Sequence, residues 1–255
     1  MMREPIDELE VDLAYAKAGQ VHFDRTLFEL GENDVREPSL LPGWTRAHVI
    51  AHVGFNARAL TRLVDWATTD IPRPMYESVD ARSHEIDTGA ALSDIELRTL
   101  SGTEAEALEA AWSRVPPDRW AYRVSNAQGV RIPVIDTVWM RSRELWLHAL
   151  DLDLSASTAD VPAAVQRRIT QNVLDTWATR DGYRVHATVP ATGERLEPAP
   201  SRIREADSTC AHLTVSGSLP NLMAWVTGRR HTGVSEVDTS GRDIGAAPSL
   251  GLSCR

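Results

Sequence analysis

The sequence contains almost no lysine. Lys17 is the only one among 255 residues, so nearly every fixed positive charge is carried by an arginine. Acidic residues outnumber basic ones by 36 to 27, which gives a formal net charge of −9. This balance argues against nucleic acid or an anionic membrane as the main partner, because both attract basic surfaces. An anionic small molecule would need a local cluster of arginines.

Cysteines and long apolar runs are also scarce. The two cysteines, Cys210 and Cys254, are too few for a disulfide framework. No run of about 18 apolar residues predicts a transmembrane helix, and no N-terminal apolar stretch has the length of a signal peptide. Because 42% of the residues are hydrophobic, the chain can bury a sizeable core. We therefore expect a globular protein of the cytoplasm.

Helical periodicity dominates residues 1–158, which we expect to form a four-helix bundle. The expected helices run from Ile6 to about Leu30, from the N-cap Thr45 to about Ala67, from Ser93 to just before Pro116, and from Asp136 or Thr137 to about Leu154. Ser93 and Glu96 have the spacing of a capping box. We expect a loop over 68–78 and a loop or short hairpin over 120–133.

The character of the chain changes after about residue 158, so we expect a smaller α/β domain over 159–255 and an α+β protein as a whole. A helix follows Pro162 and ends at Gly182, and another covers 219–229. The runs that predict strands are 183–189, 211–218 and, more weakly, 195–199. We expect the tail after Gly241 to be weakly ordered.

A polar stripe interrupts the fourth expected helix, "TVWMRSRELWLHALDLD", which is otherwise apolar around most of its circumference. Arg141, Glu144, His148 and Asp151 lie three or four residues apart and so share one face. Burying them unpaired would cost about 1–3 kcal/mol for each neutral polar group and more for a charge. Either Arg141 pairs with Glu144 while His148 bonds to Asp151 or a backbone carbonyl, or the stripe binds a metal ion.

The second expected helix offers further ligands for such a metal. Its apolar surface carries His48 and His52 one turn apart, continued by Asn56. Two helices that each present an imidazole inward favour a metal site over isolated core histidines. A set of two histidines and one glutamate leaves a coordination position open on zinc, which is typical of a catalytic site.

These motifs resemble those of the mycothiol-dependent maleylpyruvate isomerases, a family of DinB-like metalloenzymes. The similarity is carried by "LPGWTRAHVIAHVGFNARAL" and "TVWMRSRELWLHALDLD", extends through "PMYESVDARSHEI", and is weaker in "VSGSLPNLMAWVTGR". The resemblance implies a DinB-like four-helix bundle that binds zinc through His52, Glu144 and His148. It also implies that mycothiol supplies the attacking thiol and that Arg229, or the adjacent Arg230, borders the active site.

The implied reaction is the cis-to-trans isomerisation of maleylpyruvate to fumarylpyruvate in aromatic catabolism. Adding a thiolate turns the double bond into a single bond, and expelling it after rotation restores a trans double bond. The substrate is a dianion, so we expect Arg82 and Arg229 to bind its carboxylates. We expect Asp151 and His48 to orient the ligating imidazoles, and Arg141 to neutralise buried carboxylate charge.

Two other functions fit the same residues. A mycothiol S-transferase would use the same zinc site to attack an electrophile and keep the thioether product. A non-catalytic bundle would satisfy the polar stripe internally, bind no metal, and use its C-terminal domain to bind a partner. The S-transferase would differ from the isomerase in how it binds substrate carboxylates. The non-catalytic bundle would differ from the isomerase because it would contain no metal.

Overall fold

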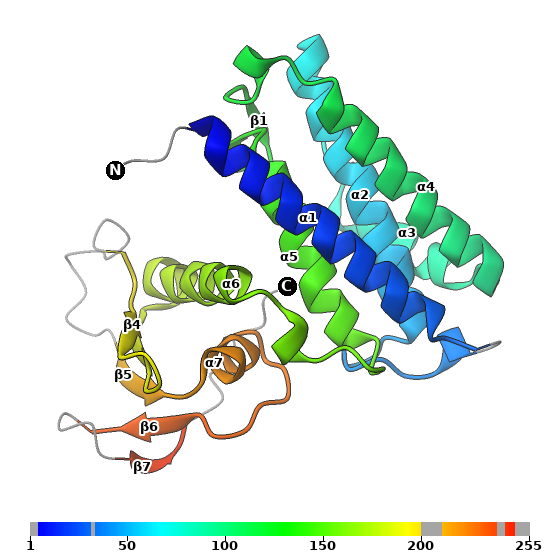
Figure 1. Cartoon of the computed structure of the whole chain (residues 1–255). Coiled ribbons are helices and arrows are strands. Elements are labelled where there is room, and N and C mark those ends of the chain that lie inside the picture. Colours follow the sequence, from blue (N-terminus) through cyan, green and yellow to red (C-terminus); the bar gives the residue numbers. More distant parts are fainter. Residues whose placement is uncertain (1–4, 32–33, 200–210, 239–242, 248–255) are drawn as a thin grey trace. The chain divides into compact units, whose positions relative to one another are not determined.

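The computed structural model describes residues 5–31, 34–199, 211–238 and 243–247. The chain divides into two compact units, Met1–Ala156 and Ser157–Arg255. The first unit is built from helices and the second combines helices with a sheet (Figure 1). This confirms the predicted α+β class, with a helical N-terminal part followed by a smaller α/β part.

Long helices form the first unit. They are α1 (Pro5–Phe28), α2 (Arg46–Thr69), α4 (Asp94–Ser113) and α5 (Asp136–Asp151), joined by the shorter α3 (Val79–Ala90) and the 3-10 turns η1 (Asp34–Arg36) and η2 (Pro117–Arg119). α2 packs on α4 and α5, and α1 packs on α5 (Figure 1). The four long helices are those that the periodicity predicted, although α5 ends three residues earlier than expected.

The capping residues act as predicted. Thr45 is the N-cap of α2 in a capping box whose third helical residue is His48. Ser93 caps α4: its side chain accepts from the backbone N–H of Glu96, and its own backbone N–H donates to the Glu96 carboxylate. These local bonds satisfy N–H groups that no helical carbonyl can reach, so both starts were visible in the sequence.

Two short elements complete the first unit. Residues 120–133 contain the antiparallel strands β1 (Arg123–Ser125) and β2 (Arg131–Pro133), which confirms the short hairpin. The sequence did not predict α3, because few of its residues are apolar and buried. It packs closely on α2: a Cβ at Gly89 would lie 2.6 Å from Phe55 and 2.9 Å from Ala51.

The core of the first unit forms two apolar clusters, and α2 and α5 contribute to both. One contains Ile50 with Ala149, and the other contains Leu60 with Val138. Buried polar residues lie on the same two helices. They include His52 and Asn56 on α2 and Arg141, Ser142 and Asp151 on α5. The bundle therefore buries polar groups in an otherwise apolar interior, which lowers its stability unless these groups are hydrogen-bonded.

The second unit has a sheet with helices. Its elements are η3 (Thr158–Asp160), α6 (Ala163–Thr176), the π-helical turn η4 (Trp177–Asp181), β3 (Tyr183–Val189), β4 (Glu194–Leu196), β5 (Ala211–Ser216), α7 (Leu219–Val226), β6 (Ser235–Val237) and β7 (Asp243–Ala246). Among the described residues the strand order is β4-β3-β5-β6-β7, with only β3 and β5 parallel. Gly182 ends the helical segment at φ 71°, as its position predicted.

Parts of the second unit differ from expectation. β4 begins one residue before the expected strand 195–199 and covers only its start, and the sequence gave no sign of β6. The expectation of a weakly ordered tail after Gly241 was wrong for 243–246, which form β7 paired with β6. Residues 248–255, Cys210 and Cys254 lie outside the described residues. None of the described helices has the length and apolar character needed to cross a membrane.

Candidate metal centre

Three side chains from two helices converge inside the bundle. His52 comes from α2, and Glu144 and His148 lie one turn apart on α5. The Nε2 atom of His52 lies 3.0 Å from Glu144 Oε2, and the Nε2 atom of His148 lies 3.1 Å from the same oxygen. One potential ligand atom from each residue lies within 4.8 Å of the other two. The structure thus brings together the three residues predicted as ligands.

Asp151 fixes the orientation of one imidazole. Its Oδ2 atom lies 2.8 Å from Nδ1 of His148, and its side chain is fully buried. Because a carboxylate only accepts, Nδ1 carries a proton, and Nε2 faces Glu144 from the other side of the ring. A histidine held in this way by a carboxylate is typical of metal sites. The bond fits the role expected for Asp151.

Burial and hydrogen bonding set the protonation of the two histidines in opposite directions. Burial lowers the pKa of His52 to about 4, against the opposing effect of its bond to Glu144. Burial also disfavours the charged form of His148, but the bonds to Asp151 and Glu144 outweigh it and raise the pKa of that ring. A metal would therefore meet a neutral His52, and below the pKa of His148 it would displace a proton from that ring.

Glu144 is held as a carboxylate. Burial alone would raise its pKa, but hydrogen bonds from His148 and His52, together with the charge of Arg143, hold the pKa well below its usual range. The Nη2 atom of Arg143 donates to Glu144 Oε1 over 3.1 Å, so the imidazoles share the other oxygen. This asymmetry leaves Oε2 directed at the space between the two rings.

The donor set fits a zinc ion. A tetrahedral zinc with bonds of about 2.0–2.2 Å separates neighbouring donors by about 3.4 Å, close to the 3.0 and 3.1 Å between Glu144 Oε2 and the two Nε2 atoms. Two neutral imidazoles and one carboxylate would leave a net charge of +1 on the site, which favours an anionic fourth ligand. The two Nε2 atoms crowd one carboxylate oxygen, an arrangement that a cation would stabilise in place of protons.

Arg82 of α3 lies beside the centre. Its Nη2 atom is 3.5 Å from Nδ1 of His52, and its guanidinium lies 5.8 Å from the ring centre of Tyr76. The structure thus places Arg82 next to the predicted ligands, and not on a distant surface. Its role toward a substrate stays a prediction.

Three residues that the sequence analysis did not single out also contribute. Tyr76 contacts Arg82, Arg143 bonds to Glu144, and the ring of Trp44 packs edge-on against His52 at 5.6 Å. Trp44 and Tyr76 lie in the segments just before α2 and α3, where helical periodicity carries no information. Arg143 is adjacent to Glu144, but its spacing placed it off the polar stripe.

Two supporting residues make direct contacts other than those expected. Among the described residues Arg141 makes no ion pair with Glu144, because Gln20, Asn56 and the carbonyl of Val53 accept its hydrogen bonds instead. Within the described part of the chain, the hydrogen bonds and ion pairs of His48 include none of the three predicted ligands. Its Nδ1 atom bonds to the backbone N–H of Thr45 over 3.2 Å, so it belongs to the cap of α2.

Arg229 belongs to the second unit, three residues after the end of α7. Its backbone N–H donates to Ala224 and its Nη1 atom donates to the carbonyl of Thr227 over 3.0 Å. These bonds satisfy backbone carbonyl groups at the C-terminal end of α7. A role for Arg229 in binding a thiol or substrate stays a prediction.

Comparison with known proteins places these features in context. The family model described as "Mycothiol maleylpyruvate isomerase N-terminal domain" matches residues 17–153. A crystal structure of the mycothiol-dependent maleylpyruvate isomerase is 35% identical, with a TM-score of 0.83 over 94% of this chain and 95% of that chain. The structure of an H52A mutant of the mycothiol-dependent maleylpyruvate isomerase is 34% identical, with a TM-score of 0.82 over the same shares. A search among curated proteins gave no match.

Proposed function

Because the chain belongs to the mycothiol-dependent maleylpyruvate isomerase family, a family of isomerases, we propose that it converts maleylpyruvate to fumarylpyruvate with mycothiol as the attacking thiol. The observation that carries this proposal is the likeness at 35% identity, which covers both units and not only the bundle. The likeness across the second unit supports an isomerase over a protein that shares the bundle alone. The triad of His52, Glu144 and His148 supports a metal-dependent reaction.

The reaction moves electrons without net gain or loss of atoms. The thiolate forms a carbon–sulfur bond to the alkene, and the displaced electron pair moves onto the conjugated ketone oxygen. The former double bond is then a single bond and rotates. The pair returns, the carbon–sulfur bond breaks, and the alkene is left trans with the thiolate released.

The side chains of the centre would hold zinc in this scheme. When bound, zinc lowers the pKa of a coordinating thiol, so that a thiolate is present at neutral pH. Asp151 holds the Nδ1 proton of His148, so that Nε2 is the nitrogen that a metal would meet, and Arg143 donates to the outer oxygen of Glu144. Trp44 packs edge-on against the ring of His52. Each of these contacts keeps a donor atom directed at the same point.

Arginines would bind the dianionic substrate. Arg82 lies beside His52, and a guanidinium can bind a carboxylate through two parallel hydrogen bonds. We propose the same role for Arg229, with Arg230 as its neighbouring alternative. In a protein with a net charge of −9, such local cations are needed to attract a dianion.

The first experiment measures the metal. Protein purified without chelator should contain about one zinc per chain by elemental analysis, and His52→Ala should lose it. The wild-type protein should then isomerise maleylpyruvate only when mycothiol is added. A folded wild-type protein that binds no zinc, even after zinc is added back, would contradict the proposal and favour a bundle without a metal.

A second experiment separates the isomerase from a mycothiol S-transferase. Arg82→Gln and Arg229→Gln should each lower kcat/KM for maleylpyruvate by at least about tenfold, because a hydrogen bond to a charged group contributes about 1.5–3 kcal/mol. Conjugation of mycothiol to an uncharged electrophile should not change. Arg230→Gln tests the neighbouring alternative, because a loss found in Arg230→Gln and not in Arg229→Gln would assign the role to Arg230. Unchanged maleylpyruvate turnover in the Arg82 and Arg229 variants would contradict the assignment of both arginines.

A further inference from the structure

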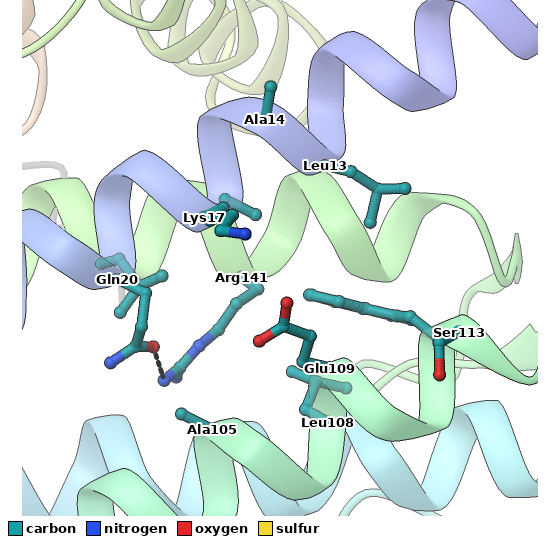
Figure 2. A pocket seen from close by; sticks show the side chains of 12 residues that line it. Leu13, Ala14, Lys17, Gln20, Ala105, Leu108, Glu109, Ser113 and Arg141 are labelled. Carbon is teal, nitrogen blue, oxygen red and sulfur yellow. Dashed lines mark hydrogen bonds between the residues drawn. The ribbon is translucent and has the colours of Figure 1, made fainter.

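A cavity of the first unit lies between α1, α4 and α5. Its volume is about 310 Å³, at the lower end of the range of small-molecule sites. Figure 2 shows side chains of α1 and α4 on its two sides, with Arg141 of α5 between them. We call it the α1–α4 groove. Its lining includes Lys17, Gln20, Leu108, Trp112, Arg141 and Leu145.

The groove contains a buried cation. Arg141 is only 2% exposed, yet it lines the groove. Its Nη1 atom donates to the carbonyl of Val53 over 2.6 Å and to Asn56 Oδ1 over 3.3 Å. Its Nη2 atom donates to Gln20 Oε1 over 2.9 Å, the bond drawn in Figure 2. All three acceptors are neutral.

Among the described residues the hydrogen bonds of Arg141 go to neutral acceptors, and no carboxylate forms an ion pair with it. The charges of Glu144 and Asp24 act on it only at longer range, and burial lowers its pKa to about 10. A buried cation without an anionic partner is costly, because it has lost water without gaining an opposite charge. A guanidinium has five N–H donors, and these three bonds use three of them. A carboxylate bound in the groove would accept hydrogen bonds from the others.

The rest of the groove is apolar inside and charged at its rim. Leu108 and Leu145 are 1% exposed, and Trp112 contributes a large apolar face. The rim carries Lys17 from α1 and Glu109 from α4, both exposed. Counting Arg141, two cations and one carboxylate face the groove. Its charge therefore favours a ligand with one negative group.

We propose that the α1–α4 groove binds a small organic carboxylate with an apolar body, whose carboxylate meets Arg141 and whose hydrocarbon part packs against Leu108, Trp112 and Leu145. A planar guanidinium recognises a carboxylate through two parallel hydrogen bonds. Burying the hydrocarbon part removes apolar surface from water, which favours binding. This site is independent of the proposed isomerase function, since none of the three predicted metal ligands lines it.

Octanoate is a suitable probe, and octan-1-ol is its uncharged counterpart. Isothermal titration calorimetry on the zinc-loaded full chain should show octanoate binding at least tenfold tighter than octan-1-ol. Ala105→Phe places a ring in the groove and should abolish binding, whereas Ala107→Phe, at an exposed position on the same helix outside the groove, should leave it unchanged. Lys17→Gln should weaken binding severalfold.

Removing the metal with a chelator distinguishes this site from the metal centre. Octanoate binding at the groove should survive chelation, because its ligand group is Arg141. Loss of binding on chelation, survival of binding in Ala105→Phe, or equal affinity for octan-1-ol would each overturn the proposal, as would no binding at all. Circular dichroism of both phenylalanine variants establishes that they are folded, so that lost binding is not lost structure.

Discussion

Asp151 decides which nitrogen of His148 can serve a metal. Its carboxylate holds the proton on Nδ1, and this leaves Nε2 directed at Glu144. Asp151→Asn keeps the size of the side chain but removes the charge that supports the bond. We expect zinc affinity to fall about 10–100-fold, as for other carboxylates that support a histidine ligand. Competition with a chromogenic chelator measures the change.

The matched control for this prediction is Asp118→Asn, which removes a carboxylate from an exposed position of the first unit. It should bind zinc as the wild type does. Equal zinc affinity in Asp151→Asn and the wild type would show that the bond to His148 is dispensable.

Zinc binding should also depend on pH in a way that follows from the two imidazoles. The pKa of His52 is lowered to about 4 by burial, so this ring is neutral over the working range. The pKa of His148 is raised, because Asp151 and Glu144 outweigh the effect of burial. Binding must therefore displace one proton below the pKa of His148 and none above it.

We accordingly expect the apparent zinc affinity to fall about tenfold for each pH unit below the pKa of His148 and to level off above it. Titrations between about pH 5.5 and 8.5 measure the profile. In Asp151→Asn the break should move to lower pH, because the charge that raises the pKa is gone. A slope of two protons, or a break that does not move, would refute this assignment of charge.

The sequence predicted the three converging residues but not all of their partners. Spacings of three and four residues place Glu144 and His148 on one face of α5, and the structure brings His52 of α2 to the same point. The same spacing allowed a pair between Arg141 and Glu144, but the hydrogen bonds of Arg141 go to other partners. Periodicity gives the face of a helix, but the direction of a long side chain depends on acceptors of other helices, here Gln20 of α1.

At the scale of elements, the position of α3 depends on one glycine. A Cβ at Gly89 would lie 2.6 Å from the ring of Phe55, too close for the helices to keep their separation. We expect Gly89→Ala to lower the free energy of unfolding by about 1–3 kcal/mol, through overpacking between α2 and α3. Urea unfolding followed by circular dichroism measures this loss.

Gly102 provides the comparison for this prediction. It lies within α4, and a Cβ there would meet no atom within 4 Å. Gly102→Ala should therefore stabilise the protein by up to about 1 kcal/mol, the difference in helix propensity. Should Gly89→Ala stabilise the protein as well, the contact between α2 and α3 would be looser than described.

Elements with strong local signals were predicted well, and those that depend on distant partners were not. Thr45 and Ser93 cap their helices through bonds within four residues, so the sequence alone indicates them. α3 has few apolar residues and is held by its packing on α2. β6 and β7 are three and four residues long and pair mainly with each other. Strands this short carry too little alternation to stand out.

At the scale of the whole molecule, a metal would join segments far apart in the chain. His52 and Glu144 are 92 residues apart in sequence and come from different helices. A ligand that binds only the folded state stabilises it, by about 2.7 kcal/mol at a free concentration 100 times its Kd. We expect zinc to raise the thermal unfolding midpoint, and a chelator to reverse the rise.

His52→Ala should fold without this dependence on zinc, because it lacks one of the three ligands. Differential scanning calorimetry with and without zinc, on both proteins, measures the two shifts. An equal zinc-dependent rise in His52→Ala would mean that zinc binds elsewhere on the chain.

Because the sequence has one lysine, a single side chain can be labelled with amine-reactive reagents. Reagents that acylate side-chain amines can modify only Lys17, the one lysine of the chain, which is exposed at the rim of the α1–α4 groove. The α-amino group is the other amine, and its lower pKa allows the two to be distinguished by the pH of labelling. A fluorophore attached to Lys17 would therefore sit at one defined place on every copy, without any engineered cysteine.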